Sequence, residues 1–279
     1  CRAHKEEAVK FGCCVNLLPH DPAWGGLEYA AELKKLGYDY VEYPLKELAA
    51  MDGQRFAEFL RTVRETDLPC RSCNDLLPPN FQLVGPQVTS AEEVRAYLEN
   101  ALARAAQLGA SYVVFGSPWS RKCPEGFPLQ EAEKQIIGFL RCAADTASRF
   151  GIVVAVEHNN HTETNTLNHY AEVVRIAELA ARPNVGALCD YYHLRMENDS
   201  PQAVLAAVPV HTHFSQKEER AYMTDLSKEP LLPEYAAVLR RLGYHGGVSV
   251  ESRVTGKDCW LTGARTALAL LRSVFSQKA

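Results

Sequence analysis

Three carboxylates and one imidazole stand at the ends of four apolar segments in the second half of this sequence of 279 residues. Glu157 ends IVVAVE, Asp190 ends NVGALCD, His213 ends VPVHTH and Glu251 ends GVSVE. Carboxylate oxygens and an imidazole nitrogen suit a hard or borderline divalent cation and leave positions open for substrate oxygens. One such residue alone would be an ordinary polar strand end, but four in succession predict a site for one Mn²⁺, Mg²⁺, Co²⁺ or Zn²⁺ ion.

The segments that position these residues alternate between two hydrophobic periodicities along the whole chain. Apolar runs predict eight strands, at residues 9–17, 38–43, 68–75, 111–117, 152–158, 184–190, 208–215 and 247–252. Apolar residues at helical spacing predict helices at 26–37, 53–65, 91–109, 129–151, 167–180, 200–206, 231–243 and 261–275. Eight such βα units without a linker predict a single (β/α)8 barrel domain over residues 1–279. An open doubly wound sheet is less consistent with the sequence, because no GxGxxG or GxxxxGK follows any strand.

In a barrel of this kind the loops after the strands form one rim, so the four polar strand ends are expected to meet there. A cation at that point would stabilise the negative charge that develops when a hydrogen next to a carbonyl is removed. Glu157 and Glu251 end strands five and eight, so they would approach a substrate from opposite sides. Proton transfer between them would epimerise a carbon or isomerise an aldose, and loss of a β-substituent would make the enzyme a dehydratase or lyase.

Composition limits the partners of the protein. The sequence is 47% hydrophobic and carries a net charge of −4, without a basic run that could follow a nucleic acid backbone. No stretch approaches the length of a membrane helix, and the opening CRAHKEEAVK is too polar for a signal peptide, which favours a cytoplasmic protein. The sequence leaves open whether the protein is a homo-oligomer and whether Cys1 is a native terminus.

The nine cysteines are interpreted as reduced, because most lie in apolar segments. Cys70 and Cys73 form a CxxC pair within a predicted strand. Strand alternation predicts that they point to opposite faces and share a metal poorly.

These motifs resemble the xylose-isomerase-like barrels, and most closely their sugar isomerase and epimerase branch, which includes the ketose 3-epimerases. The resemblance covers essentially the whole chain and is strongest from residue 153 to residue 256. The motifs that carry it are EHNNHTE (residues 157–163), DYYH (190–193), HTHFSQKEER (211–220) and VESRVTG (250–256). The resemblance implies a metal-dependent enzyme, with Mn²⁺ as the preferred ion and a small sugar or polyol as substrate.

It also implies roles for individual residues. The metal ligands are Glu157, Asp190, His213 and Glu251, with Glu157 and Glu251 also catalytic. Substrate contacts are implied for Asn160, Glu163, His193 and Arg220. Because Arg220 lies one residue farther from His213 than the epimerase pattern has it, Lys217 is an alternative.

Several other residues at the rim have two interpretations. His158 is either a second base, as in related barrels that cleave C-glycosides, or a hydrogen-bonded structural residue. Strand alternation places His211 one layer below His213, which favours a supporting role. Trp119 and Trp24 would stack on a sugar or cover the barrel mouth. Further candidates for a sugar pocket are Asn16, His20, Glu42, Asn74 and Asp75, whereas Trp260 is expected in the core.

Two alternatives belong to other classes of protein. Apurinic endonucleases of the same superfamily use three metals, but this chain has no histidine between His20 and His158 and no D-x-H after strand seven. A non-catalytic barrel stabilised by a metal would have little use for Glu163 and His193 beside the ion. The sequence therefore favours the enzyme.

Overall fold

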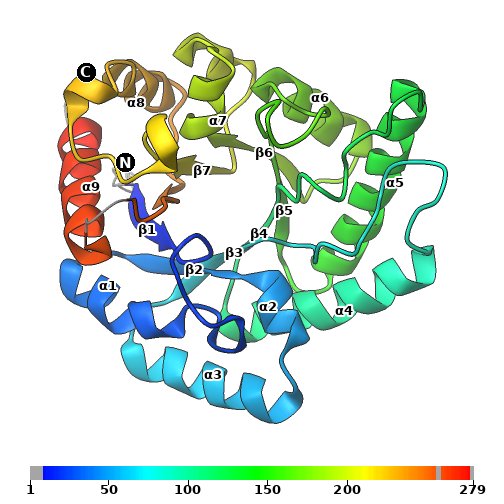
Figure 1. Ribbon diagram of the computed structural model, residues 1–279, viewed down its shortest axis with the longest axis horizontal. Coiled ribbons are helices and arrows are strands. Elements are labelled where there is room, and N and C mark those ends of the chain that lie inside the picture. The colour runs from blue at the N-terminus through cyan, green and yellow to red at the C-terminus, as the bar shows by residue number, and fades with distance from the viewer. Residues whose placement is uncertain (1–8, 256–258, 277–279) are drawn as a thin grey trace, which may run out of the picture.

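The structure is a computed structural model that describes residues 9–255 and 259–276, so Cys1 lies outside the described residues. Eight parallel strands close into one barrel in chain order, and the first strand also pairs with the last (Figure 1). The strands are β1 (Lys10–Cys14), β2 (Tyr40–Pro44), β3 (Cys70–Asn74), β4 (Tyr112–Phe115), β5 (Val153–Glu157), β6 (Val185–Asp190), β7 (His211–Phe214) and β8 (Gly247–Val250). The predicted (β/α)8 barrel is confirmed.

A ring of helices surrounds the strands. Its members are α1 (Ala30–Leu36), α2 (Leu45–Ala50), α3 (Gly53–Thr66), α4 (Ala91–Leu108), α5 (Leu129–Ser148), α6 (Tyr170–Ala180), α7 (Tyr191–Met196), α8 (Leu232–Arg241) and α9 (Trp260–Phe275). Short 3-10 helices add η1 (Pro22–Trp24), η2 (Leu27–Tyr29), η3 (Pro201–Ala206), η4 (Glu218–Arg220) and η5 (Leu226–Lys228). The segment predicted at 200–206 is thus a 3-10 helix. The short helices α2 and α7 were not predicted, because six residues give too little periodicity.

Local sequence signals define where the longer helices begin and end. Ser90 accepts a hydrogen bond from the backbone of Glu93, and the Glu93 side chain accepts one from Ser90, so α4 starts with a capping box. The helix ends at Gly109, whose φ of 83° favours glycine. Apolar helix faces then pack on the outside of the strands and form one large core. None of the described helices is long and apolar enough to cross a membrane.

The inside of the barrel is filled differently from its outside. Three buried residues, Val114, Ala155 and Leu188, form a small apolar cluster apart from the main core. Side chains alternate along a strand, so the residue two positions beyond each of these also points inward, nearer the carboxyl end. For Ala155 and Leu188 that residue is Glu157 or Asp190, and the apolar floor therefore supports a polar layer.

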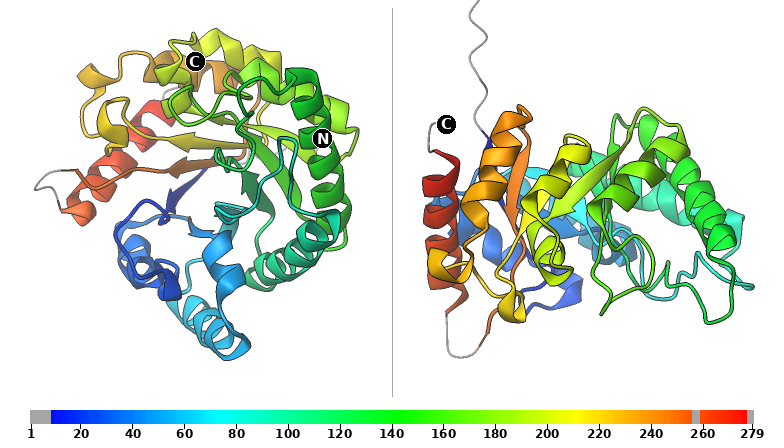
Figure 2. Two further views of the ribbon diagram at one scale, coloured as in Figure 1. Left: turned by 45° about the vertical axis from the view of Figure 1, so that its right-hand side comes forward. Right: turned by 90° about the horizontal axis from the view of Figure 1, so that it is seen from above.

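Strand register brings this polar layer to one level of the barrel. Asp190 pairs with His213 across β6 and β7, and Glu157 pairs with Leu188 across β5 and β6. Figure 2 shows the longer connecting loops gathered at this end of the barrel. The fold therefore places the predicted ligands at one rim.

The prediction that Cys70 and Cys73 point to opposite faces is wrong, whereas the prediction that they are reduced is confirmed. The register between β2 and β3 shifts between Val41, which pairs with Cys70, and Glu42, which pairs with Ser72. This irregularity adds a residue to β3 and breaks the alternation. The sulfurs of Cys70 and Cys73 lie 3.8 Å apart, and both thiols are free and buried in the core.

Candidate metal centre

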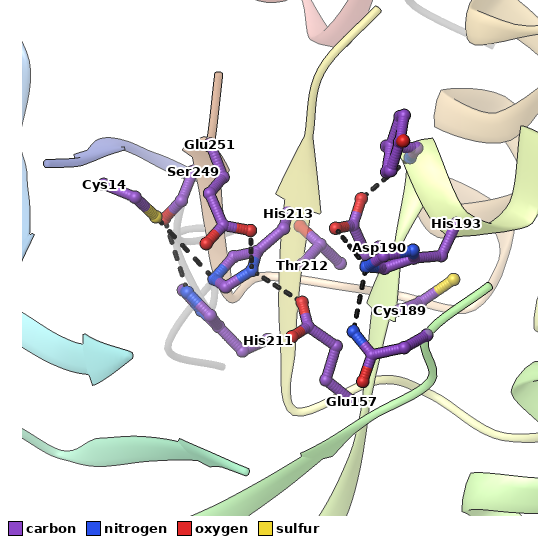
Figure 3. Close-up of polar contacts among 12 residues, drawn as sticks. Cys14, Glu157, Cys189, Asp190, His193, His211, Thr212, His213, Ser249 and Glu251 are labelled. Atoms are coloured by element: carbon purple, nitrogen blue, oxygen red, sulfur yellow. Dashed lines mark hydrogen bonds and ion pairs between the residues drawn. The ribbon is translucent and has the colours of Figure 1, made fainter. Parts of the chain in front are cut away.

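Four ligand groups from consecutive strands converge at the carboxyl end of the barrel. One ligand atom from each of Glu157, Asp190, His213 and Glu251 lies within 4.8 Å of those of the other three. All four side chains are buried. Figure 3 shows Glu157 and Glu251 reaching the same nitrogen of His213 from two sides. We call these four residues the acidic cluster.

The imidazole of His213 is the centre of this cluster. Its Nδ1 lies 2.9 Å from Oε1 of Glu157 and 3.1 Å from Oε2 of Glu251. A nitrogen that faces two carboxylates can share a cation with them when it carries no proton. Three buried carboxylates require positive charge nearby; Arg220 supplies one charge beside Asp190 and Glu251, and a divalent ion would supply the rest. The donor set of oxygen and nitrogen therefore fits a divalent cation, without choosing among Mn²⁺, Mg²⁺, Co²⁺ and Zn²⁺.

The same surroundings separate the pKa values of the carboxylates. Burial raises the pKa of Glu157 to about 7 and that of Asp190 to about 6, and neighbouring acids add to both shifts. Burial acts on Glu251 in the same direction, but the guanidinium of Arg220 and the imidazole of His213 outweigh it and lower this pKa to about 2. Two of the three carboxylates thus resist ionisation in the metal-free protein.

We expect a divalent cation to release protons when it binds, and to bind more weakly as the pH falls from about 8 to about 5. Glu157 and Asp190 must be ionised to act as ligands, and they take up protons as the pH passes below about 7 and about 6. Calorimetric titration in buffers of different ionisation enthalpy measures both effects. An affinity that does not change with pH would contradict these two residues as ligands.

A cavity of about 400 Å³ opens onto the acidic cluster. Its lining includes two members of the cluster, Glu157 and Glu251, together with Asn74, Asp75, Trp119, Asn159, Glu163 and Arg220. This volume is in the range of small-molecule sites. The walls are rich in hydrogen-bonding groups, which suits a hydroxylated ligand.

Arg220 lies in this cavity, whereas Lys217 does not line it. Positive φ values of 57° at Glu219 and 53° at Arg220 turn the chain back toward the barrel. The Arg220 guanidinium lies 3.0 Å from Asp190 Oδ2 and 3.6 Å from Glu163 Oε1. The Lys217 ammonium instead donates a hydrogen bond to Asn198 at 3.2 Å. The extra residue in the loop is therefore absorbed by this turn.

His193 stands one helical turn beyond Asp190, because Asp190 itself caps helix α7. Asp190 Oδ1 accepts a hydrogen bond of 2.7 Å from the backbone of Tyr192, and this bond caps the start of the helix. The turn brings His193 Nε2 to 3.6 Å from Asp190 Oδ2, and the backbone of Asn160 donates to His193 Nδ1 at 3.1 Å. The structure thus brings Asn160 and His193 together beside the cluster.

His158 occupies a structural position. Its Nε2 accepts a hydrogen bond of 3.2 Å from the backbone of Asp190, and its Nδ1 lies 3.4 Å from the carbonyl oxygen of Asn168. Burial lowers the pKa of His158 to about 4, which keeps the ring neutral. With both nitrogens occupied by the backbone, the ring is placed to hold β6 against the loop after β5.

The predicted pocket residues outside the cluster divide into two groups. Asn16, Asn74, Asp75 and Trp119 line the cavity, and Lys46 lies 5.1 Å above the Trp119 ring. The others have partners elsewhere: Trp24 stacks on Arg55, His20 pairs with Glu47, and Glu42 pairs with His211. Trp260, which was expected in the core, is partly buried and packs on Tyr29. Of the two tryptophans considered for a sugar, only Trp119 reaches the site.

Arg121 is a buried residue of the site that sequence reasoning missed. Its guanidinium donates to the carbonyl oxygens of Gly116 at 2.8 Å and Glu157 at 2.9 Å, and also to Thr166 and to the side chain of Asn159. It thereby ties the end of β4 to the end of β5. A single arginine in a loop gives no sequence pattern, so no signal could have found it.

Gly116 leaves room for the side chain of Glu157. A Cβ atom at this position would lie 2.4 Å from Glu157 Oε2. We expect Gly116→Ala to displace that carboxylate and to lower the cation affinity by about 10-fold or more, since ligand geometry sets affinity. Calorimetric titration with Mn²⁺ checks this.

The matched control is Gly138→Ala in α5, where an added Cβ meets no atom within 4 Å. Since alanine favours helix over glycine, this variant should gain about 0.5–1 kcal/mol of unfolding free energy and keep its cation affinity. Equal affinity in the two variants would contradict the position of Glu157 described above.

Fold and site together define a (β/α)8 barrel with an acidic cluster at its rim that could hold a cation. The chain matches the xylose isomerase-like TIM barrel family over residues 30–274 and belongs to that family. A ketose 3-epimerase from Arthrobacter globiformis is 27% identical to it over 260 residues, which cover 88% of this chain and 83% of that protein.

Two solved structures are similar throughout. A D-psicose 3-epimerase studied in the presence of D-fructose has a TM-score of 0.84 at 20% identity, covering 96% of this chain and 100% of that one. A 3-keto-D-glucoside 4-epimerase from E. coli, in its apo form, has a TM-score of 0.76 at 22% identity, covering 95% and 99%. These TM-scores support the fold, and the relatives confirm the resemblance to the ketose 3-epimerase branch.

Proposed function

We propose that the protein is a metal-dependent sugar epimerase that removes and returns a proton next to a ketose carbonyl. The observation that carries this proposal is the convergence of Glu157, Asp190, His213 and Glu251 within 4.8 Å of one another, with Glu157 and Glu251 lining an open cavity. The name of the Arthrobacter relative, a ketose 3-epimerase, supports the same reaction class. These four residues would hold the ion, which we propose to be Mn²⁺.

The two glutamates have different roles in the proposed proton transfer. Glu157 and Glu251 reach the same nitrogen of His213 from strands β5 and β8, and in this proposal one takes a proton from a carbon while the other returns a proton to its opposite face. The bound cation supplies electrophilic stabilisation of the negative charge on the substrate oxygens. Glu163 and Arg220 line the cavity beside these groups and orient the substrate hydroxyls.

The substrate is proposed to be an uncharged sugar without a phosphate group. Lys46 lies 2.8 Å from Asp75, so its charge is already paired, and Arg220 contacts three carboxylates. To bind Lys46 or Arg220, a phosphate would have to displace these acids, which leaves Arg253 as the third cation of the lining. Hydroxyl groups instead match the amides and carboxylates of the lining.

Of two alternatives, the nuclease fits the described residues less well, and the dehydratase or lyase differs only in its product. The second group near enough to hold an ion, Cys14 with Glu42 and His213, shares its histidine with the acidic cluster and so offers no separate ion site of the kind a three-metal nuclease needs. A dehydratase or lyase would use the same cluster, and its product distinguishes it. A gel assay on abasic DNA tests the nuclease directly.

The deciding experiment incubates the Mn²⁺-loaded protein with D-fructose, D-psicose and a 3-keto-glycoside in deuterium oxide. Deuterium at the carbon next to the carbonyl, together with the inverted ketose as product, is the expected result. Loss of water without inversion would indicate a dehydratase. No exchange with any of these sugars would overturn the proposal.

A further inference from the structure

A second buried polar group lies directly beneath the acidic cluster. It consists of Glu42 on β2, His211 on β7 and Ser249 on β8, all of them fully buried. Glu42 Oε1 lies 2.6 Å from His211 Nε2 and also accepts a hydrogen bond from the Ser249 hydroxyl. Ser249 in turn lies 2.6 Å from the hydroxyl of Tyr40. Figure 3 shows His211 and Ser249 on the far side of the His213 ring from Glu157.

The His213 ring connects this lower group to the cluster above it. Its Nδ1 faces Glu157 and Glu251, whereas its Nε2 lies 3.4 Å from Glu42 Oε2. A neutral imidazole carries one proton, and the nitrogen that binds a cation must be the one without it. If Nδ1 binds the cation, the proton lies on Nε2, and Glu42 Oε2 is placed to accept a hydrogen bond from it.

The lower group has the properties of a fixed acceptor. The two oxygens of Glu42 face two imidazoles, with Oε1 2.6 Å from His211 Nε2 and Oε2 3.4 Å from His213 Nε2. His211 and Ser249 leave Glu42 Oε1 little freedom to rotate, so Oε2 stays directed at His213. The Cys14 thiol, 3.8 Å from His213 Nε2, is a weak alternative acceptor, and burial raises its pKa.

We propose that Glu42 is a positioning residue that fixes the proton of His213 on Nε2 and thereby presents Nδ1 to the divalent cation. Glu42 does not touch the substrate, and it acts through His213 alone. This inference rests on the proposed function only in taking the acidic cluster as a cation site. In this inference His211 and Ser249 hold the Glu42 carboxylate in place through their hydrogen bonds.

The test is the cation affinity of the Glu42→Gln variant, measured by calorimetry with Mn²⁺ and without any sugar. A glutamine keeps the size of the side chain but brings an amide donor to the acceptor position. We expect the affinity to fall by about 10–100-fold, as is typical when the partner of a ligating histidine is lost. Glu42→Asp, which keeps a carboxylate, should recover part of this loss.

Glu47→Gln is the matched control. Glu47 also binds a histidine nitrogen, His20 Nε2 at 2.8 Å, but neither residue belongs to the acidic cluster. Its cation affinity should equal that of the unchanged protein. A second measurement, NMR of the histidine ring nitrogens in the zinc-loaded unchanged protein, keeps the inference testable if Glu42→Gln does not fold.

The outcomes separate the inference from the proposed function. A folded Glu42→Gln protein that binds Mn²⁺ within about twofold of the unchanged protein would overturn the inference and leave the proposed function standing. A proton found on Nδ1 of His213 in the zinc-loaded protein would also overturn the inference, and it would remove His213 from the four proposed ligands. An unchanged protein that binds no divalent cation would overturn both.

Discussion

Glu157→Gln and Glu251→Gln are each expected to lower the epimerisation rate of the Mn²⁺-loaded protein by about 10²–10⁴-fold, the usual contribution of a proton-transferring group. Each substitution removes a charged ligand and a proton carrier without changing the size of the side chain. The rate is measured as deuterium exchange and ketose inversion at a saturating Mn²⁺ concentration. Calorimetry on the same variants gives the loss of cation affinity.

Folding and catalysis can be separated in these variants. The folded metal-free protein holds a proton on Glu157 up to about pH 7, because burial raises its pKa above the ordinary value. Between the ordinary pKa and about 7, the unfolded chain loses this proton while the folded protein keeps it, so the folded state becomes less stable as the pH rises through this range. Glutamine removes this effect, so Glu157→Gln should unfold at the same or a higher denaturant concentration at pH 8.

The control for this pair is Glu133→Gln, on α5 and bonded to Arg175 at the surface. It removes a carboxylate from the same chain but not from the cluster, and it should keep full activity. If Glu157→Gln also kept full activity, neither the ligand assignment nor the proton transfer proposed for Glu157 could stand.

The barrel and its acidic cluster were predictable because both follow from local sequence patterns. A buried parallel strand is an apolar run, and the first polar residue that ends it, such as Glu157 or Asp190, must lie at the carboxyl rim. The D-x-x-H spacing was informative for a similar reason. Asp190 caps a helix, and one turn of that helix fixes where His193 lies.

The groups that support the cluster were not predictable in the same way. Glu42 contacts His211 across 169 positions of the sequence, and only the closed barrel brings the two together. The extra residue near Arg71, which turns Cys70 toward Cys73, depends on the pairing of β2 with β3. Contacts of this kind arise from tertiary packing, and no periodicity in the chain encodes them.

The Arg121→Met variant is expected to lose about 3–5 kcal/mol of unfolding free energy, a large effect for one substitution. The Arg121 side chain is fully buried, and burial lowers its pKa only to about 10, so it is charged at neutral pH. Methionine fills a similar volume but leaves the buried oxygens of Gly116, Glu157 and Thr166 without their donor. Denaturant unfolding of the metal-free protein measures the loss.

The Arg121→Met protein that remains folded should also have a lower epimerisation rate, because the ends of β4 and β5 are no longer tied together around Glu157. Arg121→Lys keeps the charge but cannot donate in as many directions. Its unfolding free energy should therefore lie between those of the unchanged protein and Arg121→Met. Arg149→Met serves as the control. Arg149 pairs with Glu99 and its side chain is 62% exposed, so a change within about 0.5 kcal/mol is expected. If Arg121→Met were as stable as Arg149→Met, the buried hydrogen bonds of Arg121 would not be what holds the floor of the site in place.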